Sequence, residues 1–167
     1  MAKKNEDKYK QFSNRLLDWY DVSRRALPWR ATPGEISNPY FVLLSEIMLQ
    51  QTVVATVIPY FIRFIEKWPT INELAQADFY EVSSLWAGLG YYRRAKNLHE
   101  TAKIISIEHN GLVPNNKEVL LTFPGIGEYT AAAITAIAFD TKSNVVDGNI
   151  ERIFSRLYKI EKPLELS

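Results

Sequence analysis

Leu120-Leu-Thr-Phe-Pro-Gly-Ile-Gly-Glu-Tyr-Thr-Ala131 is the strongest local signal in this sequence, because it predicts two helices joined by a tight turn. The turn spans residues 124–127, and an alanine-rich segment follows it to Phe139. Exposed N–H groups at a glycine turn and a helix N-terminus can bind a phosphate oxygen. Gly125 and Gly127 therefore predict a phosphate contact that positions a nucleic acid without reading its sequence. A Gly-x-Gly pair alone is more often a plain helix–helix turn, so the prediction depends on the whole stretch.

Helical periodicity extends through the rest of the chain. Apolar residues recur every three or four positions in residues 6–22 and 148–159, and we expect these two stripes to pack on each other or on a missing segment. Residues 27–39, with three prolines and a glycine, predict a loop, and Pro59 would kink or break its helix. Val145-Val146 is too short for a strand, so the predicted fold class is all-α. Further helices are predicted at residues 40–52, 53–68, 71–75, 78–86 (with Asp78 as N-cap), 91–109, 116–122 and 128–139.

The composition is that of a folded domain. The chain has 167 residues, 47% of them apolar, and a formal net charge of +1, which neither indicates nor excludes a nucleic-acid partner. It has no cysteine, which excludes disulfides and thiolate metal sites. The charged start is not a secretory signal, and no apolar run approaches the ~20 residues of a membrane span. We therefore expect a cytoplasmic protein, nucleoid-associated if bacterial, with no membrane partner.

Two acidic residues far apart in the sequence have settings that favour opposite ionisation states. Glu46 lies in an apolar run, and burial raises the pKa of a carboxyl group, which suits general acid or base work. Asp147 is predicted to cap the last helix, where the helix N-terminus favours the ionised form. Such a pair fits loss of a base from a sugar, where an acid protonates the leaving group and an anion stabilises the sugar cation. The structural alternatives are a glutamate at an exposed helix edge and an aspartate that is only a cap.

The sequence Tyr91-Tyr-Arg-Arg94 is an aromatic and basic cluster at a predicted helix start. It predicts stacking and contacts from Arg93 and Arg94 to a nucleic-acid backbone, although a solvated helix face is the structural alternative. His99 and His109 are expected at the surface.

Together these stretches resemble the helix-hairpin-helix DNA glycosylase superfamily of base-excision repair. In that superfamily an aspartate follows the hairpin after some twenty residues, as Asp147 follows Gly125 to Gly127 here. The adenine DNA glycosylase branch matches best, over roughly residues 10–160. The matching stretches are Leu27-Pro-Trp-Arg30, Pro39-Tyr40, Ser45-Glu-Ile-Met-Leu-Gln-Gln-Thr52, Trp86-Ala-Gly-Leu-Gly-Tyr-Tyr-Arg-Arg-Ala-Lys96 and Val145-Val-Asp-Gly-Asn149.

The resemblance implies an enzyme that removes undamaged adenine mispaired with 8-oxoguanine, after flipping the nucleotide out of the duplex. It implies that Glu46 protonates the adenine and then helps to activate water. Asp147 would stabilise the sugar cation or a transient covalent adduct. Tyr129 occupies the position of a nucleophilic lysine in bifunctional relatives, so strand cleavage through a Schiff base is not expected. Read alone, Tyr129 is equally typical of a buried aromatic residue.

The resemblance also implies which residues meet the DNA. Gln51 and Tyr91 match residues that wedge into the duplex and fill the vacated stack. Thr52 and Leu89 match neighbours of the 8-oxoguanine. The remaining implied residues are Arg93, Arg94, Gly125, Gly127 and Thr130 as DNA contacts, and Trp29 and Arg30 as the lining of the adenine pocket.

A division into two helical domains is implied as well. Residues 28–140 would form a six-helix barrel domain, with the helix-hairpin-helix at about residues 116–139. Residues 1–27 and 141–167 would be parts of a second domain that in the family holds a four-iron four-sulfur cluster on four cysteines. This chain has no cysteine, so we expect a truncated second domain and no bound cluster or metal. The expected partner is double-stranded DNA with an adenine:8-oxoguanine mismatch, bound by a monomer.

Two other functions stay open. One is a related glycosylase for a thymine mismatch or an oxidised pyrimidine, although Met48-Leu-Gln-Gln-Thr52 and Tyr129 argue against the oxidised-pyrimidine branch. The other is an inactive DNA-binding remnant. The presence of both Glu46 and Asp147 argues against loss by point change, whereas the missing second half argues for loss by truncation.

Overall fold

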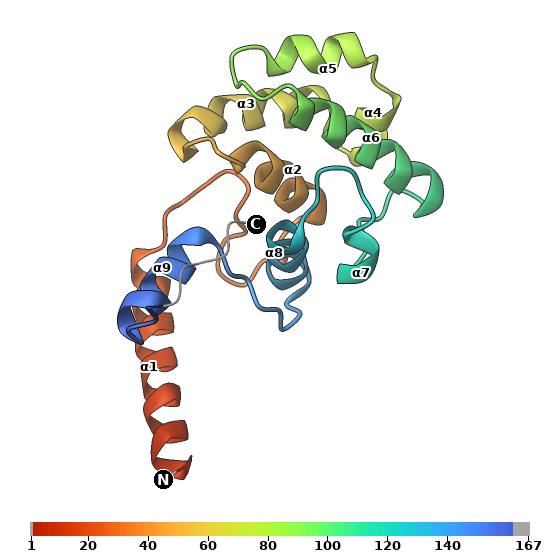
Figure 1. The fold of residues 1–167 in the computed structure, drawn as a ribbon. Helices are drawn as coiled ribbons and strands as arrows, with labels where there is room; N and C mark the ends of the chain where they lie inside the picture. Colours follow the sequence, from red (N-terminus) through yellow and green to blue (C-terminus); the bar gives the residue numbers. More distant parts are fainter. Residues whose placement is uncertain (1, 162–167) are drawn as a thin grey trace.

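The computed structural model describes residues 2–161, and every regular element in that range is a helix (Figure 1). The expectation of an all-α fold is confirmed. Residue 1 and residues 162–167, the outer ends of the two predicted terminal ranges, lie outside the described residues. The helices are α1 (Ala2–Ser23), α2 (Pro39–Leu49), α3 (Val54–Lys67), α4 (Ile71–Gln76), α5 (Phe79–Trp86), α6 (Arg93–Glu108), α7 (Lys117–Leu120), α8 (Glu128–Phe139) and α9 (Gly148–Leu157).

Several helices begin at a residue whose side chain accepts the free N–H groups of the first turn. Asn38 caps α2 and Thr70 caps α4 in this way. The prediction that Asp78 is an N-cap is confirmed, because its carboxylate accepts a 2.6 Å hydrogen bond from the N–H of Tyr80. α8 differs, since its N-cap is Gly127 and no side chain caps its first turn.

α2 is the central helix of the fold, and α3, α6 and α8 all pack against it. Its residues Leu43, Leu44, Ile47 and Met48 are between 0% and 1% exposed. Replacing one such residue with alanine typically costs about 2–5 kcal/mol of stability. The core therefore fixes the position of the α2 backbone, and with it the point from which the side chain of Glu46 extends.

Two helix boundaries and one predicted break differ from the sequence-based expectation. α2 ends earlier than predicted, at Leu49, because Gln51 has a left-handed φ of 56° that no helix can accommodate. α6 begins at Arg93 because Tyr91 has a φ of 49°. Of the kink or break predicted at Pro59, the break is wrong, since α3 is continuous through this residue. The apolar face of α3 packs into the core and holds the helix together on both sides of the proline.

The expectation that His99 lies at the surface is wrong. Its side chain is 3% exposed and stacks on Phe79, with ring centroids 5.7 Å apart. Its Nε2 forms a 3.0 Å hydrogen bond with the carbonyl oxygen of Ala77. α4 and α5 pack on α6 and cover this face of the helix, and burial lowers the pKa of His99.

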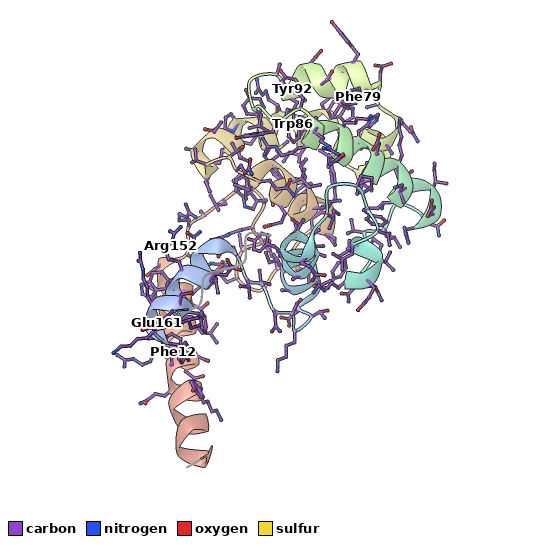
Figure 2. All side chains as sticks on the ribbon, viewed as in Figure 1. Phe12, Phe79, Trp86, Tyr92, Arg152 and Glu161 are labelled. Carbon is purple, nitrogen blue, oxygen red and sulfur yellow. The ribbon has the colours of Figure 1, made fainter. Side chains whose placement is uncertain are left out.

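The apolar stripes of α1 and α9 do not bury each other within residues 2–161. Residues 9–23 of α1 are exposed, and Phe12, at 63% exposure, stands clear of the core (Figure 2). α9 has no buried residue. α1 extends away from the body formed by α2 to α8 (Figure 1). None of the helices in the described range is long and apolar enough to cross a membrane.

Candidate active site and nucleic-acid interface

Glu46 lies on α2 between two buried residues, Ser45 and Ile47, and its own side chain is only partly exposed. Burial raises the pKa of the Glu46 carboxyl to about 7, against a smaller lowering by the charge of Arg30. A carboxyl group with this pKa exists in both protonation states near neutral pH. It can therefore donate a proton and, once ionised, accept one.

The loop before α2 contains Trp29 and Arg30. Trp29 is buried, and its ring packs edge-on against Phe61 with centroids 5.2 Å apart. Arg30 is partly exposed and donates from Nη1 to the carbonyl oxygen of Arg25 (3.3 Å). The effect of Arg30 on the pKa of Glu46 shows that the two charges lie near each other.

Asp147 caps α9, as the sequence predicts. Its Oδ1 accepts hydrogen bonds from the backbone N–H groups of Ile150 (2.8 Å) and Asn149 (3.1 Å). Its Oδ2 accepts a third from the side-chain amide of Asn149 (3.0 Å). These bonds, that from the Ile150 N–H foremost, lower the pKa of Asp147, so the carboxylate is ionised at neutral pH.

Tyr129, at the start of α8, connects the two acids electrostatically. Burial raises the pKa of its phenol to about 12, and the charges of Glu46 and Asp147 add to this increase. Residues a hundred positions apart are thus brought within electrostatic reach of one hydroxyl group. Because the phenol stays protonated at neutral pH, its hydroxyl can donate a hydrogen bond.

The hairpin of α7, the turn 124–127 and α8 has the geometry that its glycines predict. Gly125 has a left-handed φ of 75°, and a Cβ added there would lie 2.5 Å from the side-chain amide of Asn97. Gly127 has open space around it. Both glycines are exposed, and the first N–H groups of α8 face no capping side chain. The turn can therefore accept an anion at the positive end of the α8 dipole.

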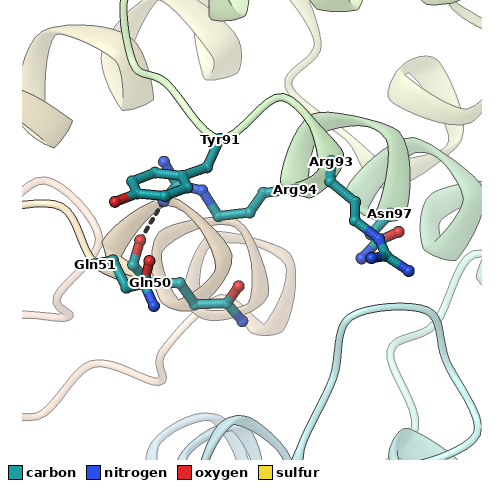
Figure 3. Close-up of a pocket in the computed structure, with 6 residues that line it drawn as sticks. All are labelled: Gln50, Gln51, Tyr91, Arg93, Arg94 and Asn97. Carbon is teal, nitrogen blue, oxygen red and sulfur yellow. Dashed lines mark hydrogen bonds between the residues drawn. The ribbon is translucent and has the colours of Figure 1, made fainter.

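A surface hollow of about 480 Å³ lies between the loop after α2 and the start of α6 (Figure 3). Gln51 and Tyr91 stand at its rim, and both have left-handed backbone conformations. Each such conformation costs a non-glycine residue of the order of 1–3 kcal/mol, and strain of this kind is concentrated at functional sites. Tyr91 is 61% exposed, so a large aromatic ring faces solvent here. The lining residues are Gln50, Gln51, Tyr91, Arg93, Arg94 and Asn97.

In this structure Arg94 is not available for the expected contact with a DNA backbone. Its side chain is 7% exposed, and its guanidinium is engaged with backbone carbonyl groups of the protein itself. The neighbouring Arg93 is exposed and remains available for such a contact. The basic pair at the start of α6 therefore divides into one surface cation and one buried cation.

Three other predicted DNA contacts are less accessible than expected. The side chain of Leu89 is 5% exposed, and that of Thr130 is 4% exposed. Thr52 is partly exposed, but its Oγ1 accepts a 3.0 Å hydrogen bond from Arg94 Nη2. In this conformation the side chains of Leu89 and Thr130 lie beneath the proposed DNA-binding surface and are not part of it.

Sequence reasoning missed two residues that connect the hairpin to the hollow. Gln50 donates from Nε2 to the carbonyl oxygen of Gly125 (3.2 Å) and to Thr130 Oγ1 (3.4 Å). Asn97 on α6 lies directly beneath Gly125. The available signal was the polar Gln50-Gln51 pair directly after the apolar helix.

Residues 44–165 match the HhH-GPD superfamily of base excision DNA repair proteins. This match covers well over half of the chain. The chain belongs to this superfamily. The all-helical fold and the glycine hairpin described above are thus those of a member of this superfamily.

Curated relatives with high identity are adenine DNA glycosylases. The protein of Rattus norvegicus is 49% identical over 154 residues, which is 89% of this chain and 30% of the relative. The protein of Mycolicibacterium smegmatis is 48% identical over 141 residues, which is 84% of this chain and 47% of the relative. This chain therefore spans between about a third and a half of the length of these relatives.

Solved structures share the fold. A thermostable thymine-DNA glycosylase superposes with a TM-score of 0.79 at 30% identity, over 90% of this chain and 68% of that one. An endonuclease III structure with DNA superposes with a TM-score of 0.72 at 24% identity, over 89% of this chain and 68% of that one. At 24% identity, the endonuclease III match supports the fold alone.

Proposed function

We propose that this chain contains the catalytic centre of an adenine-specific DNA glycosylase that acts on adenine mispaired with 8-oxoguanine or guanine. The proposal rests first on one observation: Glu46 has a pKa near 7 and Asp147 a lowered pKa, and both charges act on Tyr129. It is supported by the identity to adenine glycosylases, which exceeds the 30% identity to the thymine-DNA glycosylase.

Glu46 acts as the general acid in this reaction. The protonated carboxyl donates its proton to a ring nitrogen of the flipped-out adenine. The C1′–N bond then breaks with its electron pair on the base, which leaves as neutral adenine. The resulting Glu46 carboxylate accepts a proton from the water that attacks C1′, which restores the acid and yields an abasic site.

Asp147 stabilises the positive charge that develops on the sugar, either as a nearby anion or through a transient covalent bond to C1′. Its three hydrogen bonds keep it ionised and fix its orientation. Tyr129 donates a hydrogen bond within the site. A phenol with a pKa of about 12 supplies no amine for a Schiff base, so the enzyme is monofunctional.

DNA engagement uses the exposed groups of the interface. The turn at Gly125 and Gly127 binds a backbone phosphate, and Arg93 binds another. Gln51 and Tyr91, here called the wedge residues, enter the duplex when the adenine is extruded. Trp29 and Arg30 line the pocket that receives the adenine.

The chain binds mismatched double-stranded DNA as a monomer. Residues 28–140 form the barrel domain, while residues 1–27 and 141–167 belong to a second helical domain. The exposed apolar residues of α1 and α9 support this division, because the helices of residues 28–140 leave them largely uncovered.

The iron–sulfur cluster that the resemblance implies does not fit the residues of this chain. The sequence contains no cysteine, and no group of three His, Asp or Glu side chains in the described range could hold a metal ion. No step of the proposed reaction depends on such a cluster.

A panel of duplexes tests the proposed substrate. The purified chain is mixed in excess with duplexes that contain adenine opposite 8-oxoguanine, adenine opposite guanine, thymine opposite guanine or an oxidised pyrimidine. We expect release of adenine from the first two and no release from the others. Release of thymine or of the oxidised pyrimidine in preference to adenine would contradict the assignment.

A further inference from the structure

Arg94 is almost fully buried behind the rim of the hollow, although its side chain is charged. Its Nη1 donates to the carbonyl oxygens of Gln50 (2.6 Å) and Met48 (2.7 Å), and at 3.3 Å to that of Ile47. These carbonyl groups belong to the last turn and C-cap of α2, where no partner exists inside the helix. Arg94 therefore caps α2 from another helix, at the negative end of its dipole.

The same guanidinium also holds the loop between α5 and α6. Its Nη2 donates to the carbonyl oxygens of Gly90 (3.1 Å) and Leu89 (3.3 Å). It also donates to Thr52 Oγ1 (3.0 Å), on the loop after α2. A planar guanidinium can direct two nitrogens at two separate loops, whereas a lysine ammonium has its three donors at one point.

The wedge residues Gln51 and Tyr91 stand at the tips of the two loops that Arg94 joins (Figure 3). Arg94 bonds the carbonyl of Gln50, which directly precedes Gln51, and lies 5.2 Å from the centroid of the Tyr91 ring. Both wedge residues have left-handed φ angles that only fixed surroundings maintain. Trp86 reinforces the second loop by donating from Nε1 to the carbonyl oxygen of Gly90 (3.0 Å).

We infer that Arg94 is the positioning residue that holds Gln51 and Tyr91 as one rigid unit, so that both enter the duplex together. This inference rests on the proposed function, because it assigns a role in the entry step of base extrusion. Arg94 touches neither the DNA nor the reacting atoms. It acts by holding the two loops in one fixed arrangement before DNA binds. The entropic cost of ordering the loops is then not added to the extrusion step.

The central test replaces Arg94 with lysine and with methionine in the full chain. The lysine variant keeps a positive charge at the end of α2 but cannot join both loops. We expect it to fold, to bind mismatched duplex within about threefold of the parent affinity, and to release adenine about a hundredfold more slowly. The methionine variant is expected to lose stability as well. A lysine variant that released adenine within threefold of the parent rate would overturn the inference.

Two controls separate positioning from a general loss of structure. Ile105→Ala removes core volume from the same helix, eleven residues beyond Arg94 along α6, and its release rate is measured at a temperature at which the same fraction of the protein is folded. We expect its release rate to stay within threefold of the parent. The pH profile of the lysine variant is expected to keep the parent midpoint, with only its plateau lowered. A shifted midpoint would mean that the substitution acts through Glu46, and would overturn the inference.

Fluorescence separates this inference from the proposed reaction. A 2-aminopurine placed beside the mismatch brightens when neighbouring bases unstack, whether or not a base is later released. We expect the parent to produce this increase and the lysine variant to lose most of it. An increase without adenine release would refute the proposed reaction and leave the role of Arg94 intact. No increase with the parent, or an equal increase with both proteins, would overturn the role of Arg94.

Discussion

Gln50 Nε2 donates a 3.2 Å hydrogen bond to the carbonyl oxygen of Gly125, and so joins the end of α2 to the glycine hairpin. The same amide reaches Thr130 Oγ1 at 3.4 Å. One side chain thereby fixes the distance between the proposed phosphate contact and the proposed wedge. A duplex that binds at the hairpin then lies at a fixed distance from Gln51 and Tyr91.

Replacing Gln50 with alanine is expected to weaken DNA binding more than it weakens the fold. Loss of the hydrogen bonds costs about 1 kcal/mol of stability. The hairpin is then free to shift relative to the wedge, so the affinity for mismatched duplex should fall by about tenfold. Urea denaturation and fluorescence anisotropy measure the two effects. Gln11→Ala, on exposed α1, is the matched control, and equal behaviour of the two variants would contradict this prediction.

The two hairpin glycines should respond differently to alanine. At Gly125 the φ of 75° and the approach to Asn97 both oppose a Cβ, so Gly125→Ala should lose at least about 1 kcal/mol of stability and most of the duplex affinity. At Gly127 nothing lies within 4 Å of an added Cβ, and Gly127→Ala should cost under about 1 kcal/mol. Thermal unfolding compares the stability of the two variants. An equal or larger loss of stability in Gly127→Ala would show that the turn geometry is misassigned.

Adenine release should require protonated Glu46. With a pKa of about 7, the rate should be constant at lower pH and fall as pH rises above 7, by about tenfold per unit once the carboxyl is mostly ionised. Single-turnover rates from pH 5.5 to pH 9 measure this profile. Rates that rise through pH 7 would instead indicate a base as the limiting group.

Removal of the Glu46 charge should stabilise the fold at alkaline pH. The pKa of Glu46 in the folded protein lies above the ordinary value of 4.5 for a glutamate, so ionisation costs the folded protein stability as pH rises from about 4.5 to 7. Glu46→Gln avoids this cost, and its free energy of unfolding at pH 8 should exceed that of the parent by roughly 1–3 kcal/mol. The difference should vanish below pH 4.5. Denaturant unfolding at both pH values provides the measurement, and a variant less stable at pH 8 would mean that the carboxylate has a compensating partner.

The charge of Arg30 should influence the pH at which the rate of adenine release falls. Its charge lowers the pKa of Glu46, so Arg30→Ala should raise that pKa and move the midpoint of the release profile to higher pH. The plateau rate should also fall if Arg30 lines the adenine pocket. Arg24→Ala removes a nearby charge in the sequence and should leave the midpoint unchanged. A midpoint that moves to lower pH in Arg30→Ala would contradict the arrangement.

Much of the fold was predictable because local sequence determines it. The cap at Asp147, the turn at Gly125 and the long helix ending before Gly111 each depend on residues within a few positions. The all-α class and most helix positions followed from apolar periodicity in the same way.

The remaining features depend on contacts between distant segments. Arg94 is buried because the carbonyls at the end of α2 need a partner, and neither its own helix nor its charge indicates this. His99 is buried because α4 and α5 cover α6. The influence of Glu46 on Tyr129 likewise follows from the packing of α2 against α8. Such contacts are not visible in the spacing of residues along the chain.

The most direct test of the account compares the parent chain with Glu46→Gln in single-turnover release of adenine opposite 8-oxoguanine, with duplex affinity measured alongside. The amide matches the carboxyl in size but cannot donate the required proton. We predict release by the parent at pH 7, no detectable release by the variant, and equal duplex affinity for both. Release by the variant at the parent rate would contradict the assignment of Glu46 as the general acid. A folded, DNA-binding parent that releases no adenine would contradict the assignment of the activity to this chain.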